Sequence, residues 1–232
     1  MTYSSNGIEG NTLTLKETKV VLEGITIGVK SVRELLEAIN HEKAIEYLEE
    51  LIGEKSEISE WNIKKLHQLV LKGINDANAG RYRNHDVIIS GAQHRLHNIK
   101  VPELMEKLIM NYDEWYKYHS IVRAVLLHGE LVKIHPFIEG NTRTVAMFII
   151  KYLEFLEYNI DITLFKDNSI YYRSALVRSN YFNNHLNIKE NNSFLIKFYE
   201  MLILGKNNNL RLEELVLEES INKENKKLFL EN

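Results

Sequence analysis

Apolar residues recur at helical spacing along most of the chain, and polar start signals precede several of these runs. Thr14-Leu15-Lys16-Glu17 and Ser31-Val32-Arg33-Glu34 both match the capping box, in which two side chains satisfy free backbone N–H groups at a helix start. The second run continues at helical spacing to about residue 51. Further helices are predicted over 60–72, 102–118, 120–133, 142–158, 169–182, 191–204 and 209–230.

One segment has a different pattern of residues. Residues 75–84 are polar and contain Gly80, which is typical of a loop. Between Asp86 and Asn98, the short β-branched run Val87-Ile88-Ile89 is followed by Ser90-Gly91-Ala92 and a second extended stretch. This pattern predicts a β-hairpin, which is the one good strand signal in the sequence.

The predicted fold is mainly α, with a strongly apolar helix over 142–158 as its central, buried element. The chain has 232 residues, of which 44% are hydrophobic, with 2 Pro and 0 Cys. We expect one compact domain in a reducing, cytoplasmic compartment. The net charge of -3 and the lack of a long apolar run or signal-peptide pattern give no reason to expect a nucleic-acid or membrane partner.

The loop between the helices at 120–133 and 142–158 carries the candidate chemistry. His135 stands at the end of one helix, and its ordinary pKa near 6.5 suits a general base. Gly140 lets the backbone approach a phosphate at the start of the next helix, where Arg143 can grip it. Glu139 offers the oxygen ligand that Mg²⁺ prefers beside phosphates. Each feature alone is usually structural, but together they indicate phosphate-ester chemistry.

The segment His135-Pro136-Phe137-Ile138-Glu139-Gly140-Asn141-Thr142-Arg143 resembles the signature of the Fic family. Residues 5–11 resemble the inhibitory motif of that family, in which Ser5 and Glu9 hold the characteristic positions. The resemblance implies a Fic fold, a helical bundle around a central helix with one small β-hairpin flap. It also implies a protein adenylyltransferase, which transfers AMP from ATP to a Ser, Thr or Tyr hydroxyl of a target protein, including itself.

The resemblance also implies residue roles. His135 would deprotonate the target hydroxyl, and Glu139 would hold Mg²⁺. Asn141, with backbone N–H groups from Gly140 onward, would steady the transferred phosphoryl group, and Phe137 would anchor the loop in the core. The remaining nucleotide-binding candidates are Thr142, Arg143, Tyr171 and Tyr172, and the candidates for docking the target on the flap are Val87, Ile88 and Ile89.

We divide the chain into an inhibitory-motif segment and helix at 1–30, a Fic core at 31–205 and a C-terminal helix at 206–232, all within one domain. The Fic core contains the flap at 86–98 and the active loop at 135–143. Apolar positions on the helix at 32–51 either face the core or form a face for a homodimer. His128 is expected in the core or behind the site rather than as a metal ligand.

Two positions depart from the signature. Thr142 replaces its second Gly, and Ala146 replaces its final Arg, which in the family binds the γ-phosphate and pairs with the inhibitory Glu. Glu9 therefore lacks its expected cation, and its alternatives are to stay solvated or to find Arg143. The departures keep other functions open: removal of AMP by a phosphodiesterase reaction, transfer of another group from a nucleotide, or a weakly active nucleotide-binding regulator.

We predict that Glu9 represses the enzyme weakly, because without a cation no ion pair would keep this half-buried carboxylate across the ATP site. Gly7 also weakens the short helix before it, by up to about 1 kcal/mol relative to Ala. The measurement compares auto-AMP transfer by the wild type and Glu9→Gly, and only a small rise is expected. A hundredfold rise would contradict the prediction.

Overall fold

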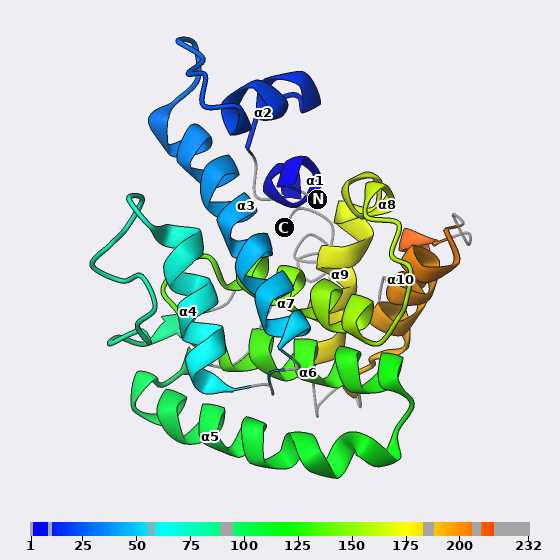
Figure 1. Cartoon of the computed structure of the whole chain (residues 1–232). Helices are drawn as coiled ribbons and strands as arrows, with labels where there is room; N and C mark the ends of the chain where they lie inside the picture. The colour runs from blue at the N-terminus through cyan, green and yellow to red at the C-terminus, as the bar shows by residue number, and fades with distance from the viewer. Residues whose placement is uncertain are drawn as a thin grey trace.

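The structure is a computed structural model that describes residues 2–8, 11–54, 56, 59–88, 95–182, 188–205 and 210–215. Helices dominate it (Figure 1). In chain order the elements are α1 (Thr2–Ile8), α2 (Leu15–Leu22), α3 (Val32–Gly53), α4 (Glu60–Leu71), β1 (Val87–Ile88), β2 (Arg95–Leu96), η1 (Asn98–Lys100), α5 (Val101–Tyr112), η2 (Asp113–Lys117), α6 (Ser120–Ile134), α7 (Asn141–Phe155), α8 (Thr163–Asp167), α9 (Ser169–Asn180), α10 (Ser193–Leu204) and η3 (Leu212–Leu215).

The predicted start signals are confirmed as capping boxes. The Thr14 hydroxyl accepts from the backbone N–H of Glu17, and the Glu17 carboxylate accepts from the backbone N–H of Thr14 at 2.7 Å. Ser31 and Glu34 make the same reciprocal pair at the start of α3. Each box satisfies two backbone donors that helix geometry leaves without a partner, so both helices begin where the sequence predicts.

Helix α7 is the central element, as predicted. It packs against α1, α3, α4 and α6, and it lies in the middle of the bundle in Figure 1. Its apolar side chains from Val145 to Leu153 are almost completely buried in the main core. Because α7 begins at Asn141, directly after the predicted active loop, the core fixes the place of that loop.

A buried pair of hydrogen bonds links helices α6, α9 and α10. His128 on α6 is fully buried, and its Nδ1 lies 2.6 Å from the Tyr199 hydroxyl on α10. Its Nε2 lies 3.0 Å from the Tyr172 hydroxyl on α9. Both ring nitrogens therefore have partners, which agrees with the expectation that His128 is a core residue rather than a metal ligand.

The hairpin is present as an antiparallel pair in which Val87 lies opposite Leu96 and Ile88 opposite Arg95. Ile89 and the rest of the connection, 89–94, lie outside the described residues. The pair follows a loop in which Gly80 has φ +70°, a conformation that glycine adopts without strain.

Several predicted details are wrong. The helix expected over 102–118 changes to 3₁₀ geometry after Tyr112, and the short helix α8 was not predicted. The helix expected over 209–230 is a 3₁₀ turn at Leu212–Leu215 in its described part, and residues 216–232 lie outside the described residues.

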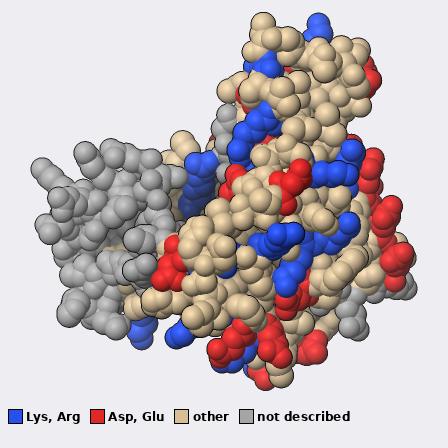
Figure 2. Space-filling view, turned by 90° about the vertical axis from the view of Figure 1, so that its left-hand side faces the viewer, with Lys and Arg blue, Asp and Glu red and all other residues tan. Residues whose placement is uncertain are grey.

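Helix α2 and the beginning of α3 project from the bundle at the top of Figure 1. Uncharged side chains predominate on this projection in Figure 2, and acidic and basic side chains are interspersed below it. Apolar side chains exposed on the projection are Leu22, Ile25, Val29 and Val32. None of the helices in the described ranges is both long and apolar enough to cross a membrane.

Buried histidines should make the fold sensitive to mild acid. Burial lowers the pKa of His128 and of His41 to about 3, whereas an unfolded chain binds protons at these residues near pH 6.5. Stability is therefore full above pH 6.5 and falls as the pH drops toward the folded pKa, by up to about 1.4 kcal/mol per pH unit for each histidine. Urea unfolding at pH 7, 6 and 5 should show this loss. His128→Gln should make the loss shallower, whereas a change at the exposed His85 should not; equal slopes would contradict the prediction.

Candidate active site

The active loop lies between two residues with left-handed backbone. His135 ends α6 with φ 48° and ψ 61°, and Gly140 precedes α7 with φ 74°. Glycine adopts this conformation freely, whereas for His it costs of the order of 1 kcal/mol and needs support from its surroundings. The chain therefore changes direction sharply at both ends of the short loop that joins α6 to α7.

Arg83 supplies that support. Its backbone N–H donates to the Pro136 carbonyl at 2.9 Å, and its Nε donates to the His135 carbonyl at 2.8 Å. The residue is 3% exposed, and its Nη1 also donates to the His85 carbonyl at 3.0 Å. A guanidinium that donates to carbonyls at the end of α6 is also favoured by the helix dipole. Arg83 therefore holds the chain on both sides of the peptide that follows His135.

Asn141 closes the loop on itself. Its Nδ2 donates to the Phe137 carbonyl at 2.8 Å, and its Oδ1 accepts from the Phe137 backbone N–H at 3.0 Å. The residue is 3% exposed. Each end of the amide has one hydrogen bond to the loop backbone, and the second N–H of Nδ2 is not used in these two bonds, so the predicted contact with the transferred phosphoryl group stays a prediction. Its backbone N–H, in the first turn of α7, is a further candidate for phosphate.

His67 on α4 lies beneath the loop and was not identified from the sequence. Its ring stacks on Phe137, with centroids 3.7 Å apart and planes 5° apart, and both residues are fully buried. Its Nδ1 accepts from the Gly80 backbone N–H at 3.0 Å, so Nε2 carries the proton and donates to the Glu139 carbonyl at 3.0 Å. The burial of Phe137 confirms it as the core anchor of the loop.

The His135 ring is neutral at physiological pH. Burial lowers its pKa to about 4, and the positive charge of Arg83 acts in the same direction. Its Nδ1 is buried, and a hydrogen bond with the Val132 backbone raises the pKa by less than burial and Arg83 lower it. The other nitrogen, Nε2, is therefore the atom suited to accept a proton from a bound hydroxyl group.

The carboxylate of Glu139 is held from both sides. Its Oε1 accepts from Asn75 at 2.7 Å, and its Oε2 pairs with Arg33 Nη2 at 2.8 Å. Partial burial raises the pKa of this group, but the bonds from Asn75 and Arg33 and the charges of Arg33 and Arg143 outweigh burial, so the net pKa lies below the usual value. Glu139 is therefore ionised at neutral pH.

Glu37 on α3 connects the active-site arginines. Its Oε1 lies 3.1 Å from Arg33 Nε and 3.2 Å from Arg143 Nη1. Its Oε2 accepts from Asn11 Nδ2 at 3.0 Å. Arg143, Glu37, Arg33 and Glu139 thus form one chain of alternating charge from α7 through α3 to the active loop. The sequence did not predict Arg33 or Glu37 as part of the site.

The start of α7 keeps the features of an anion site. Backbone N–H groups of Asn141, Thr142 and Arg143 belong to the first turn, where helix geometry supplies no carbonyl partner and the helix dipole is positive. Thr142 has helical backbone and is half-buried. Ala146, one turn further on, is 4% exposed and points into the core, so no side-chain cation exists at that position.

The two tyrosines do not form a nucleotide surface. Tyr171 is 3% exposed and Tyr172 is fully buried in the main core. The Tyr172 ring packs against Phe165 and Phe198 at centroid distances of 4.7 and 5.1 Å. Both residues pack as core aromatics, so their burial does not support the nucleotide-binding assignment, which stays a prediction. Helical spacing predicted the helix correctly but did not distinguish its inward face from a ligand-facing one.

The motif segment at the N-terminus is partly described. Ser5 lies within α1, whereas its side chain, Glu9 and Gly10 lie outside what the structure describes. Helix α1 is fastened to α3, because the Thr2 hydroxyl donates to Glu42 at 2.6 Å and lies 3.2 Å from His41 Nδ1. Arg143, the alternative partner considered for Glu9, is paired with Glu37.

The base of the flap is pinned by one aspartate. Asp86 accepts from the Asn98 backbone N–H at 2.9 Å and pairs with His97 Nδ1 at 3.0 Å. These contacts join the two ends of the hairpin just outside β1 and β2. Val87, the first residue of β1, is half-buried, and Arg83, four residues earlier, holds the active loop. The flap and the active loop are therefore anchored by the same segment.

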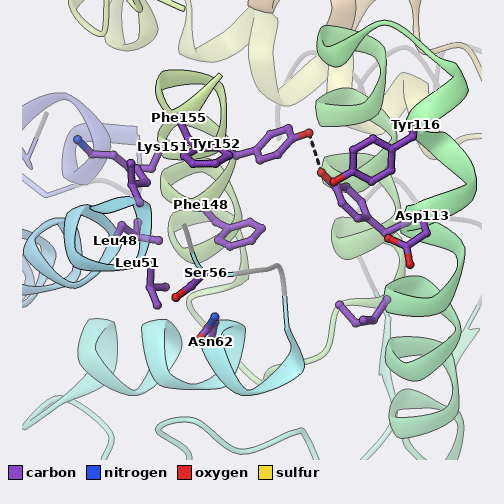
Figure 3. Close-up of a pocket in the computed structure, with 13 residues that line it drawn as sticks. Leu48, Leu51, Ser56, Asn62, Asp113, Tyr116, Phe148, Lys151, Tyr152 and Phe155 are labelled. Carbon is purple, nitrogen blue, oxygen red and sulfur yellow. Dashed lines mark hydrogen bonds between the residues drawn. The ribbon is translucent and has the colours of Figure 1, made fainter. Parts of the chain in front are cut away.

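A cavity of about 280 Å³ lies away from the active loop (Figure 3). It opens between α3, α4, α5 and the second half of α7, and none of the active-loop residues lines it. The charged end of Lys151 turns away from it, toward Glu49 at 3.1 Å and Glu154 at 2.8 Å. Because Phe148 and Tyr152 line it from the far end of α7, this cavity is separate from the site at Asn141.

Among the residues that the structure describes, no group of three His, Cys, Asp or Glu side chains is placed to hold a metal ion. Magnesium in phosphate-transfer sites is usually held by one or two carboxylates together with the substrate phosphates. The ionised Glu139, with a side chain 28% exposed beside the start of α7, fits that arrangement. It does so only if Arg33 or Asn75 yields one of the two carboxylate oxygens.

A family model described as the Fic/DOC family matches residues 57–153. The protein adenylyltransferase Fic of Nematostella vectensis is 34% identical over 178 residues, covering 73% of this chain and 40% of the relative. The protein of the same name from Drosophila willistoni is 32% identical over 154 residues, covering 63% of this chain and 30% of the relative. The chain thus spans less than half the length of these relatives.

Solved structures have the same fold. Fic-1, residues 134–508, from C. elegans superposes with a TM-score of 0.75 and 26% identity, covering 88% of this chain and 59% of that chain. A Fic domain containing signaling protein from Bacteroides thetaiotaomicron gives a TM-score of 0.70 at 21% identity, covering 88% of this chain and 81% of that chain. With the loop at 135–143 at the start of the central helix, these matches make the chain a Fic-domain protein.

Proposed function

We propose that this protein transfers AMP from ATP to a Ser, Thr or Tyr hydroxyl of a target protein, including itself. The observation that carries the proposal is the juxtaposition within one loop of a neutral histidine and a helix N-terminus with unpaired donors. A base for a hydroxyl and a cradle for a phosphate are the two elements that such a transfer needs. The similarity to proteins named adenylyltransferase supports the same activity.

In the proposed reaction the target hydroxyl attacks the α-phosphorus of ATP. His135 Nε2 takes the hydroxyl proton as the new oxygen–phosphorus bond forms. The bond from the α-phosphorus to the bridging oxygen breaks, and pyrophosphate leaves with that electron pair. Because Arg83 fixes the backbone at His135, the point from which the ring extends is set before substrates bind, which would reduce the entropic cost of reaching the reactive geometry.

The first turn of α7 would hold the transferred phosphoryl group. Its free N–H groups and positive dipole face negative charge that develops in the transition state, and they need little reorganisation because α7 is fixed in the core. Gly140 allows the chain to reverse directly before these donors. Arg143 adds positive charge from behind, where Glu37 holds it.

Magnesium fits the proposal as an ion that arrives with the nucleotide. Glu139 would hold it through a carboxylate oxygen that Asn75 or Arg33 now occupies. When bound, the ion would neutralise phosphate charge. The protein's own part is to keep Glu139 ionised, which the lowered pKa of this carboxyl achieves.

The hairpin would dock the target. Its two-residue strands leave backbone groups on the outer edge, and an extended segment can pair there with little demand on sequence. Val87 and Ile88 belong to β1 and would contribute to this docking together with Ile89, which lies outside the described residues.

His67 has a positioning role in this proposal. It supports Phe137 by stacking, the Glu139 backbone by a hydrogen bond and the Gly80 loop by another. These three contacts fix the floor of the active loop between the base and the phosphate cradle. A small displacement of that floor would move both catalytic elements relative to the nucleotide.

The first prediction from the proposed function concerns His135. Incubation with Mg²⁺ and ATP labelled on the α-phosphate should place label on protein, whereas label on the γ-phosphate should not be incorporated. His135→Ala should reduce incorporation about 10²- to 10⁴-fold, the usual contribution of a general base. His119→Ala, at an exposed histidine that begins α6, is the control. Incorporation of γ-label, or undiminished α-label in His135→Ala, would overturn the proposal.

The second prediction concerns His67. His67→Phe keeps an aromatic ring against Phe137 but removes both hydrogen bonds, and AMP transfer should fall about 10- to 100-fold. His67→Gln keeps a donor and an acceptor and should recover part of the rate. Gln68→Ala, at an exposed neighbour on α4, should leave the rate unchanged. If His67→Phe lowers only the melting temperature and not the rate, His67 has no positioning role.

A further inference from the structure

Arg33 occupies an unusual place for a surface arginine. It lies at the start of α3, far from the active loop in sequence, yet its Nη2 contacts the Glu139 carboxylate at 2.8 Å. Its Nε separately contacts Glu37 at 3.1 Å. The side chain is 53% exposed, whereas the Arg143 side chain is 5% exposed. Of the two guanidinium groups in the ionic chain, Arg33 is therefore the one that a ligand from solvent can reach.

The two contacts of Arg33 use different atoms and have different consequences. The contact through Nε to Glu37 fixes the guanidinium in place, because Glu37 is itself held by Arg143 and Asn11. The contact through Nη2 to Glu139 is to a carboxylate beside the start of α7. Phosphate bound at that helix start would repel Glu139 unless a cation offset the two negative charges, and Arg33 already contacts this carboxylate.

We propose that Arg33 is a polyphosphate-binding residue of this active site: its Nη2 exchanges the Glu139 carboxylate for a phosphate of ATP beyond the transferred one, while its Nε stays on Glu37. The proposal rests on the proposed function. A guanidinium suits the task because its fork of N–H donors matches phosphate oxygens and stays charged. The exchange conserves ion pairing at Arg33, and it frees a Glu139 oxygen when the nucleotide arrives.

The order of groups along the loop places Arg33 on the leaving-group side. The base, His135, and Glu139 stand near opposite ends of the loop. In an in-line transfer the attacking and leaving oxygens lie on opposite sides of the phosphorus. If the target hydroxyl approaches from the side of His135, a cation beside Glu139 would face pyrophosphate rather than the attacking hydroxyl. Because Ala146 offers no charge from α7 itself, α3 becomes the source of this positive group.

Calorimetric titration with two ligands tests the proposal. The α,β-methylene analogue of ATP cannot transfer AMP and carries all three phosphates, whereas AMP carries only the first. In the presence of Mg²⁺, Arg33→Ala should raise the Kd of the ATP analogue about 10- to 100-fold, as expected for a lost charge-assisted contact, and should change the Kd of AMP less than threefold. Arg33→Lys should give an intermediate Kd, because it keeps the charge but loses the fork.

Lys43→Ala, at an exposed position on the same helix, is the matched control and should leave both Kd values unchanged. Equal weakening of both ligands, an unchanged Kd or tighter binding of the ATP analogue by Arg33→Ala would overturn the assignment of Arg33. If this happens while the wild type still transfers α-label to protein, the proposed function stands. A wild type that binds neither ligand and transfers no label overturns both.

Discussion

The carboxylate of Glu37 is the interaction on which the site depends. It is nearly buried, and a buried charge is tolerated only when it is paired and hydrogen-bonded. Its partners come from three parts of the chain: Asn11 before α2, Arg33 on α3 and Arg143 on α7. Removal of any one would leave polar groups less well satisfied. The positions of the N-terminal segment and the phosphate cradle are consequently coupled through α3.

This coupling also sets the charge of the nucleotide-free site. Arg143, Glu37, Arg33 and Glu139 alternate in sign, so the charges of this ionic chain cancel before any ligand binds. A nucleotide triphosphate brings several negative charges into the same volume. Nucleotide binding must therefore rearrange existing ion pairs or bring its own cation. Arg33 is the exposed end of the ionic chain, so a rearrangement there disturbs fewer buried groups than one elsewhere in the chain of charges.

The sequence predicted those features that depend on local pattern. Both capping boxes, the central helix and the hairpin depend on residues that are close together in the sequence. The active loop is likewise one contiguous segment. His67 could not be identified this way, because its partners lie 13 and 72 residues away in the chain. Arg33 likewise pairs with a residue 106 positions distant. Such contacts are products of helix packing, which periodicity alone does not specify.

Tyr172 and Asn141 show a related limit of sequence motifs. A motif identifies a residue but not the partner that its side chain will find in the folded chain. Tyr172 packs among core aromatics and bonds to His128, and the Asn141 amide bonds to the backbone N–H and carbonyl of Phe137. In both cases a polar or aromatic group that looked available for a ligand satisfies a requirement of the fold.

In this loop, backbone contacts as well as side chains therefore position the catalytic groups. In many catalytic sites a carboxylate orients the base histidine through its second ring nitrogen. Here the Nδ1 of His135 is buried without such a partner in the described part of the chain. The backbone of His135 is held instead by Arg83, through the His135 carbonyl on one side and the Pro136 carbonyl on the other, and the ring has a hydrogen bond with the Val132 backbone. Because burial and the charge of Arg83 lower the pKa of the ring, it stays neutral and ready to accept a proton.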